Sequence, residues 1–236
     1  MKEYDENLLY QQFTERIGLT PRLLASKRDQ IPGDILKSLP PKSSISIQHN
    51  SIYYNISGYG LLGTSRIGKT CANAVVIKQG INLLLASSLK HIQDDASDWD
   101  LVQFIESNLE KHTGSSAFKI ANWVYWPECF DWMQKNAINE FNKDRLPRFH
   151  TESMKTTRLL ILDDLGRESI SKKSPDGTIP YAIGQLSLVI NYRNEHNLPI
   201  IWTSNLEEAD LIQLYVAPMY LRLVEIAPPS EWISSC

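Results

Sequence analysis

Cysteine is scarce in this 236-residue chain, which contains only Cys71, Cys129 and Cys236. Their number and spacing fit neither a disulfide framework nor a cysteine metal site. No apolar run approaches the roughly 20 residues that cross a bilayer. The acidic first residues do not resemble a secretory signal. We therefore expect a cytoplasmic protein with no membrane partner.

An excess of positive charge is also lacking. Lys and Arg total 24 against 27 Asp and Glu, a net charge of −3, so tight unaided binding of nucleic acid is not indicated. The five histidines lack the H-E-x-x-H spacing of zinc sites, and no G-x-S-x-G motif of serine hydrolases occurs. Zinc enzymes and serine hydrolases are therefore not supported.

One motif stands out in a chain whose composition is that of an ordinary globular protein. Residues 63–70 fit G-x-x-x-x-G-K-[ST], a loop whose backbone N–H groups surround nucleotide phosphates. Lys69 would contact the β and γ phosphates of ATP, and Thr70 would offer its hydroxyl to Mg²⁺. An apolar strand precedes the loop and a helix follows it, as the motif requires. The predicted nucleotide-binding residues are Gly63, Thr64, Ser65, Arg66, Ile67, Gly68, Lys69 and Thr70.

Apolar runs alternate with helical patterns along most of the chain. Strands are predicted at residues 58–62, 122–126, 159–162, 200–203 and 223–226. Residues 81–85 fit either an extension of the helix after the loop or a further strand. The alternation predicts an α/β fold, a three-layer sandwich with a mostly parallel five-stranded sheet covered by helices on both faces.

The first 50 residues differ from this pattern and predict a small helical N-terminal arm. Apolar residues at four-residue spacing predict its first helix: Leu9, Phe13 and Ile17. Thr20 followed by Pro21 is typical of the start of a second helix. We predict an arm over residues 1–50, which contacts a partner, and an ATP-binding domain over residues 51–236.

Polar side chains follow two of the predicted strands. Asp163 and Asp164 come directly after one apolar run, and Asn205 ends the next. Open α/β sheets bind ligands at the carboxyl ends of their strands. There Asp163 would hold Mg²⁺ opposite Thr70, and Asp164 would polarise an attacking water. Asn205 would position that water or touch the γ-phosphate. The alternatives are a solvated turn for the acidic pair and a structural turn amide for Asn205.

Arg222 precedes the last predicted strand and has no obvious local charge partner in the sequence. It is either a surface charge or an arginine that completes the active site of a neighbouring subunit.

In their order, these motifs resemble those of the AAA+ ATPases of the DnaC/IstB-like group, which includes replicative helicase loaders and helper ATPases of transposition. The resemblance spans residues 55–227. It implies that the strand carrying Thr203 lies between the loop strand and the strand carrying Asp163. It also implies four roles: Asp163 for Mg²⁺, Asp164 for water activation, Asn205 as sensor 1, and Arg222 as an arginine finger acting in trans in a homo-oligomer.

Three features depart from the pattern of that group. Arg66 stands where another glycine is usual, and Asp164 is shorter than the glutamate of many relatives. No Lys or Arg follows Arg222, so the sensor 2 arginine is absent and a lid domain is expected to be absent or minimal. These departures predict hydrolysis that is slow or dependent on a partner.

Three hypotheses follow. The first is an ATPase that uses Mg·ATP to load or remodel a DNA-replication partner such as a replicative helicase. The second is a weakly hydrolysing ATP-dependent switch that recruits a transposase or another DNA-acting partner. The third is a P-loop kinase of a small molecule, which would need a basic lid that the chain does not offer.

Direct contact with single-stranded DNA is a further possibility for the basic residues after the acidic pair. Arg167, Lys172 and Lys173 would contact phosphates there, but a solvated loop is the favoured alternative. Tryptophans 123, 126 and 132 are expected to pack in the core rather than to stack on bases.

Overall fold

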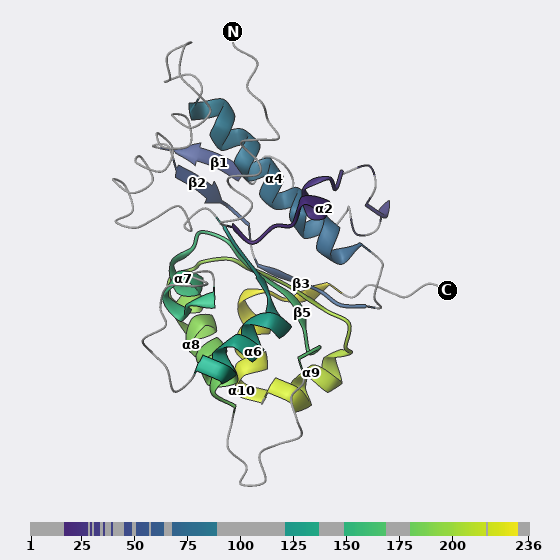
Figure 1. Ribbon diagram of the computed structural model, residues 1–236, viewed down its shortest axis with the longest axis vertical. Coiled ribbons are helices and arrows are strands. Elements are labelled where there is room, and N and C mark those ends of the chain that lie inside the picture. Colours follow the sequence, from purple (N-terminus) through teal and green to yellow (C-terminus); the bar gives the residue numbers. More distant parts are fainter. Residues whose placement is uncertain are drawn as a thin grey trace.

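A parallel sheet forms the centre of the protein in the computed structural model (Figure 1). The structure describes residues 17–27, 29, 31–33, 35, 39, 45–48, 51–56, 58–63, 68–88, 121–136, 149–168, 180–215 and 217–230. The five strands of the sheet are β3 (Tyr59–Leu61), β4 (Asn122–Tyr125), β5 (Leu160–Leu165), β6 (Ile200–Ser204) and β7 (Pro229–Ser230).

The strand order is β4-β5-β6-β3-β7, and all neighbouring strands run parallel. Strand β6, which carries Thr203, therefore lies between β3 and β5, as the resemblance implied. Every residue of β5 is buried, which is typical of a central strand covered on both faces. The expected α/β fold of the P-loop NTPase type is confirmed.

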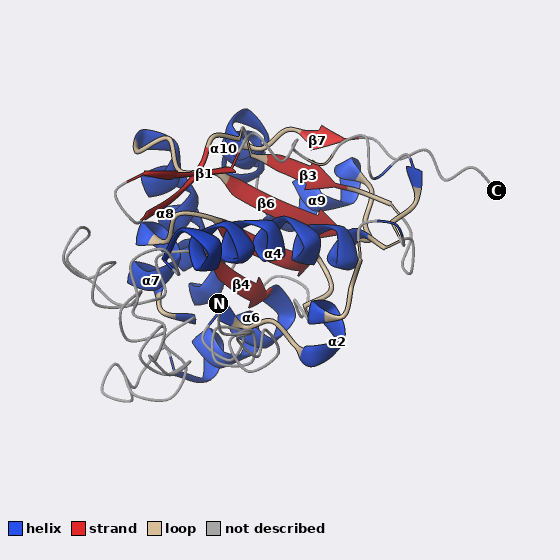
Figure 2. Cartoon of the chain, turned by 90° about the horizontal axis from the view of Figure 1, so that it is seen from above, coloured by secondary structure: helices blue, strands red, loops and turns tan. Residues whose placement is uncertain are grey.

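Helices cover both faces of this sheet. On one face lies α4 (Lys69–Ser88), together with the short helix α2 (Pro21–Leu24) and a hairpin of β1 (Ile45–Gln48) and β2 (Ser51–Tyr54). Figure 2 shows α4 crossing the strands of the sheet. The helices of the other face are α6 (Trp126–Asn136), α7 (Thr151–Thr156), α8 (Tyr181–Glu195), α9 (Glu208–Tyr215) and α10 (Ala217–Ile226).

Alternate residues of β5 belong to two separate apolar cores. Ile161 packs in the core on the α4 side, whereas Leu160 and Leu162 pack in the core formed with the helices of the other face. This alternation follows from the two-residue period of a strand. Trp123 and Trp126 are 3% and 0% exposed, so they pack in the core as expected and are not available to stack on bases.

The predicted strand at residues 223–226 is wrong. This segment lies in α10, and the fifth strand is β7, which comes directly after it. Met219, Tyr220 and Leu223 are the buried residues of α10, a spacing that places them on one face of a helix. The short apolar run alone could not distinguish a strand from one turn of a buried helix. Residues 81–85 extend α4, so the helical alternative was the correct one.

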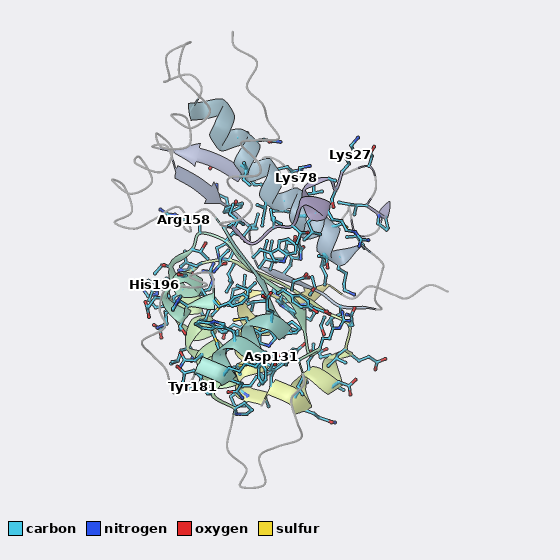
Figure 3. The ribbon with its side chains drawn as sticks, viewed as in Figure 1. Lys27, Lys78, Asp131, Arg158, Tyr181 and His196 are labelled. Atoms are coloured by element: carbon cyan, nitrogen blue, oxygen red, sulfur yellow. The ribbon has the colours of Figure 1, made fainter. Side chains whose placement is uncertain are left out.

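Part of the predicted N-terminal arm shares the core on the α4 side. Ile17, Leu19 and Ile31 pack there with apolar residues of α4. The Lys78 ammonium group of α4 donates a hydrogen bond to the carbonyl oxygen of Ser26 at 3.1 Å, and Figure 3 shows Lys78 on this side of the molecule. The Thr20 hydroxyl accepts a hydrogen bond from the Leu23 N–H at 3.4 Å, which fits its expected role at the start of α2.

Two of the residues used to predict the arm, Leu9 and Phe13, lie outside the described residues. Among the described helices, none has both the length and the apolar character that crossing a membrane requires.

A buried arginine ties α7, α8 and β6 together. Arg193 of α8 is fully buried, and its guanidinium donates to the carbonyl oxygens of Met154, Lys155, Thr157 and Pro199 at 2.6–3.2 Å. Burial lowers the pKa of Arg193 to about 9, so this group remains charged at neutral pH. A positive charge at the carboxyl end of α7 also complements the helix dipole.

We predict that Arg193→Met destabilises the fold strongly. Each carbonyl acceptor that is left buried without a donor costs about 1–3 kcal/mol, so a loss on the order of 3 kcal/mol or more is expected in urea unfolding. Arg222→Met is the matched control, because Arg222 is 55% exposed and pairs with an equally exposed Glu225; its effect should stay within about 0.5 kcal/mol. Equal effects of the two substitutions would contradict this role of Arg193.

Candidate nucleotide-binding site

A cleft of about 1180 Å³ lies where α4 begins and where β5 and β6 end. The residues that line it include Gly68, Lys69, Thr70, Asp164, Arg167, Thr203 and Asn205, together with Thr20, Arg22 and Leu23 of the N-terminal segment. Four of the predicted loop residues lie outside the described residues: Thr64, Ser65, Arg66 and Ile67. The structure thus brings segments from distant parts of the chain to one cleft.

Lys69 is the cation of this cleft that the loop motif predicted. Its ammonium group donates to the carbonyl oxygen of Gly63 at 2.6 Å and to the side-chain oxygen of Asn205 at 2.9 Å. Burial lowers the pKa of Lys69, while the charges of Asp164 and Asp163 raise it. Gly63 and Gly68 have φ of 133° and 93°, a backbone conformation that glycine adopts without strain. The two motif glycines therefore stand where the backbone conformation favours glycine.

Thr70 and Asp163 meet although 93 residues separate them in the sequence. The Thr70 hydroxyl donates to Asp163 Oδ1 at 3.1 Å, and the Thr203 hydroxyl donates to the same oxygen at 2.7 Å. Burial raises the pKa of Asp163, and the hydrogen bonds from Thr203 and Thr70 lower it. Hydroxyl and carboxylate oxygens are ligands that Mg²⁺ prefers, and neighbouring ligands of an octahedral ion at 2.0–2.1 Å lie about 3 Å apart. The Thr70–Asp163 pair therefore fits one Mg²⁺.

Asp164 faces Asn205 across the same cleft. The amide of Asn205 donates to Asp164 Oδ1 at 2.5 Å, and Oδ2 accepts from Arg167 at 3.0 Å and from the Tyr125 hydroxyl at 3.5 Å. Asp164 has φ of 66°, which costs a non-glycine residue roughly 1–2 kcal/mol. Its N–H donates to the Thr203 hydroxyl at 2.8 Å, which offsets part of that cost.

Arg222 lies apart from these residues. It is on α10, in a separate hollow of about 380 Å³ that Asn191 and Asn194 of α8 also line. The expectation that it lacks a local charge partner is wrong, because it pairs with Glu225 at 2.8 Å. The pair has the i, i+3 spacing of a helix, which was missed because this segment was predicted as a strand.

Several residues of the site were not predicted from the sequence. Thr203 was used only to mark its strand, yet its hydroxyl contacts both Asp163 and the N–H of Asp164. A hydroxyl at the end of a buried apolar strand was the available signal. No signal in the sequence marked Tyr125 or Arg22, because their places beside the cleft depend on strand pairing and on packing of the N-terminal segment.

Comparison with solved structures supports this fold. The crystal structure of DnaI matches with a TM-score of 0.50 and 16% identity over 89% of each chain. The chain has the DnaI fold. The likeness confirms, at the level of the fold, the expected resemblance to the DnaC/IstB-like group.

Two further crystal structures match less well. The DnaC helicase loader gives a TM-score of 0.49 at 12% identity, covering 89% of this chain and 98% of that one. A putative primosome component from Streptococcus pyogenes serotype M3 gives 0.41 at 18% identity, covering 88% and 74%. Family models give no match to the sequence, and no curated protein matches it significantly.

We predict that Lys69→Ala weakens ATP binding by about 10- to 100-fold, because a charge-assisted hydrogen bond to phosphate contributes about 1.5–3 kcal/mol. Isothermal titration calorimetry measures this directly. Lys135→Ala, which removes an exposed lysine from α6, serves as the control and should leave the affinity unchanged. Equal ATP affinities for the wild type and Lys69→Ala would rule out the loop as the phosphate site.

Proposed function

We propose that the protein binds Mg·ATP in this cleft and hydrolyses it to drive its action on a DNA-replication partner. The observation that carries the proposal is the convergence of the Lys69 ammonium, the Thr70–Asp163 pair and the Asp164–Asn205 pair around one cleft. Lysine, a hydroxyl–carboxylate magnesium site and a second carboxylate are the groups that phosphoryl transfer to water requires.

Each group has one part in this proposed reaction. Gly63, Gly68 and Lys69, with residues 64–67, hold the phosphates of ATP, and Lys69 neutralises charge on the transferred group. Thr70 and Asp163 would hold Mg²⁺, which would neutralise charge that develops on the phosphate oxygens. Asp164 accepts a proton from the attacking water.

Asn205 connects the Lys69 side of the proposed site with the Asp164 side. Its side-chain oxygen accepts from Lys69 and its amide donates to Asp164. A group that contacts both can sense the γ-phosphate at Lys69 and orient the water at Asp164, which is the role of sensor 1. We assign Asn205 this role on that geometry together with the resemblance.

Arg222 is proposed to act in trans, in the site of a neighbouring subunit of a homo-oligomer. It does not line the cleft of its own chain within the part that the structure describes, and its side chain is 55% exposed. An arginine supplied by a neighbour stabilises charge in the transition state of phosphoryl transfer.

The proposed partner is a replicative helicase in the cytoplasm, contacted through the arm of residues 1–50. The motif resemblance to a group that includes replicative helicase loaders supports this partner; a transposase is the alternative. ATP-dependent loading of a purified replicative helicase onto single-stranded DNA, abolished by Lys69→Ala, would support the helicase. A solvated position stays the favoured alternative for Arg167, which is exposed and pairs with Asp164; contact with that DNA is the other possibility.

Phosphate release measured over a range of protein concentrations tests the proposed ATPase activity. Wild-type specific activity should rise with concentration, as a site completed in trans requires. Asp164→Asn should lower it by about 100-fold or more at every concentration, since general-base catalysis contributes about 10²–10⁴-fold. Arg222→Ala should bind ATP normally and lose the concentration-dependent rise.

A neutral exposed variant on α9, Gln213→Ala, provides the control. Turnover that is equal in the wild type and Asp164→Asn would favour the alternative of a nucleotide-dependent switch. Specific activity that does not change with concentration in the wild type would contradict completion of the site in trans.

A further inference from the structure

A buried carboxylate lies next to the turn that carries Asp164. Glu168 is 6% exposed, and burial raises the pKa of its carboxyl group. Burial of a carboxylate is costly unless hydrogen bonds replace its water. The proposed reaction uses neither Glu168 nor its partners, and Glu168 does not line the cleft in the described structure.

Glu168 accepts hydrogen bonds from three separate parts of the fold. Its Oε1 accepts from the indole N–H of Trp126 at 2.9 Å, at the start of α6, and from the hydroxyl of Tyr215, at the end of α9. Its Oε2 accepts from the N–H of Gly166 at 2.8 Å. The Tyr215 hydroxyl also accepts from this N–H at 2.9 Å. Gly166 is thus held by both Glu168 and Tyr215.

The Gly166 turn is held from its other side as well. Gly166 has φ of 90°, and a Cβ at this position would lie 2.5 Å from Leu206 Cδ1. Leu206 directly follows Asn205. The turn is therefore confined between Leu206 and the hydrogen bonds to Glu168 and Tyr215.

The orientation of Asp164 depends on this turn. Asp164 lies two residues before Gly166, and both residues have a positive φ, 66° for Asp164. Both conformations therefore belong to one turn of the backbone. A shift of Gly166 would move the Asp164 carboxylate relative to Asn205, whose amide lies 2.5 Å away. A displacement of about 1 Å in an active site can cost on the order of 100-fold in rate.

We infer that Glu168 is a positioning residue for ATP hydrolysis: by accepting the N–H of Gly166 it fixes the turn that directs Asp164 toward Asn205 and the cleft. Tyr215 supports this role through its contacts with Glu168 and Gly166, and Trp126 completes the hydrogen bonding of the carboxylate. The inference rests on the proposed ATPase activity.

Glutamine cannot replace Glu168, because the two carboxylate oxygens both accept. In Glu168→Gln one of them becomes an NH₂ group, which only donates. If the NH₂ faces Gly166, two donors meet at the turn. If it faces the other way, it meets the indole N–H of Trp126. Either arrangement disturbs the hydrogen bonds of residue 168 that hold the Gly166 turn, while the side chain keeps its size.

The test compares Glu168→Gln, Tyr215→Phe and Met154→Ala by kcat, ATP Kd and unfolding midpoint. Glu168→Gln should lower kcat by roughly 10- to 100-fold, and Tyr215→Phe by less, because it removes one acceptor of the Gly166 N–H without adding a donor beside it. ATP Kd should stay within about two-fold in both variants, since Lys69 and Thr70 are untouched. Met154→Ala is the control: it truncates a fully buried side chain of α7, a helix that does not line the cleft in the described part of the chain.

Met154→Ala should lower the unfolding midpoint at least as much as Glu168→Gln and leave kcat within about two-fold. Hydrogen exchange of the Gly166 amide should be faster in Glu168→Gln and close to wild type in Met154→Ala. An unchanged kcat or an unchanged Gly166 exchange in Glu168→Gln would overturn the inference. So would losses of kcat that follow the losses of stability across all three variants.

Phosphate release by the wild-type protein distinguishes failure of this inference from failure of the proposed ATPase activity. If the wild type binds ATP but releases no phosphate, the ATPase proposal fails before any variant is compared, and the inference fails with it. If the wild type hydrolyses ATP and Glu168→Gln matches it, only the positioning role fails.

Discussion

The hydrogen bonds of Thr203 hold the two halves of the candidate site in register. Its hydroxyl donates to Asp163 Oδ1 and accepts the N–H of Asp164, while Thr70, at the start of α4, reaches the same Asp163 oxygen. One strand end thereby aligns both carboxylates with the phosphate-binding loop. This requires β6 to lie between β3 and β5, since only that order brings Thr203 beside both elements. The proposed chemistry therefore depends on the topology of the sheet.

Lys69 and Asp163 carry opposite charges at the cleft, and burial shifts the pKa of each. Burial lowers the pKa of Lys69 and raises that of Asp163, so each group is shifted toward its neutral form. Their mutual attraction opposes both shifts. A magnesium-bound triphosphate would place negative phosphate oxygens at Lys69 and a cation at Asp163, which stabilises the charged form of each residue. A site with these two groups is thus matched to a ligand that carries both signs of charge.

The sequence was informative where a motif fixes local geometry and less so where contacts form across the fold. The P-loop motif located Lys69 and Thr70, and polar residues at strand ends located Asp163, Asp164 and Asn205. The place of the Thr203 strand between the loop strand and the Asp163 strand came from the family resemblance. Glu168 could not be found, because its three donors come from elements brought together only by packing. The short apolar run at 223–226 was wrongly predicted as a strand, since four residues do not separate a period of two from one of 3.6.

The proposed function depends on Thr70 and Asp163 holding the magnesium ion of a nucleotide bound at Lys69. Titration of ATP into wild type and Asp163→Asn, each with Mg²⁺ and with EDTA, tests it most directly. We expect Mg²⁺ to strengthen ATP binding to the wild type and Asp163→Asn to lose about 10-fold or more of this gain, because the variant keeps the loop but lacks the anionic ligand. Retention of the full Mg²⁺ effect in Asp163→Asn would contradict it.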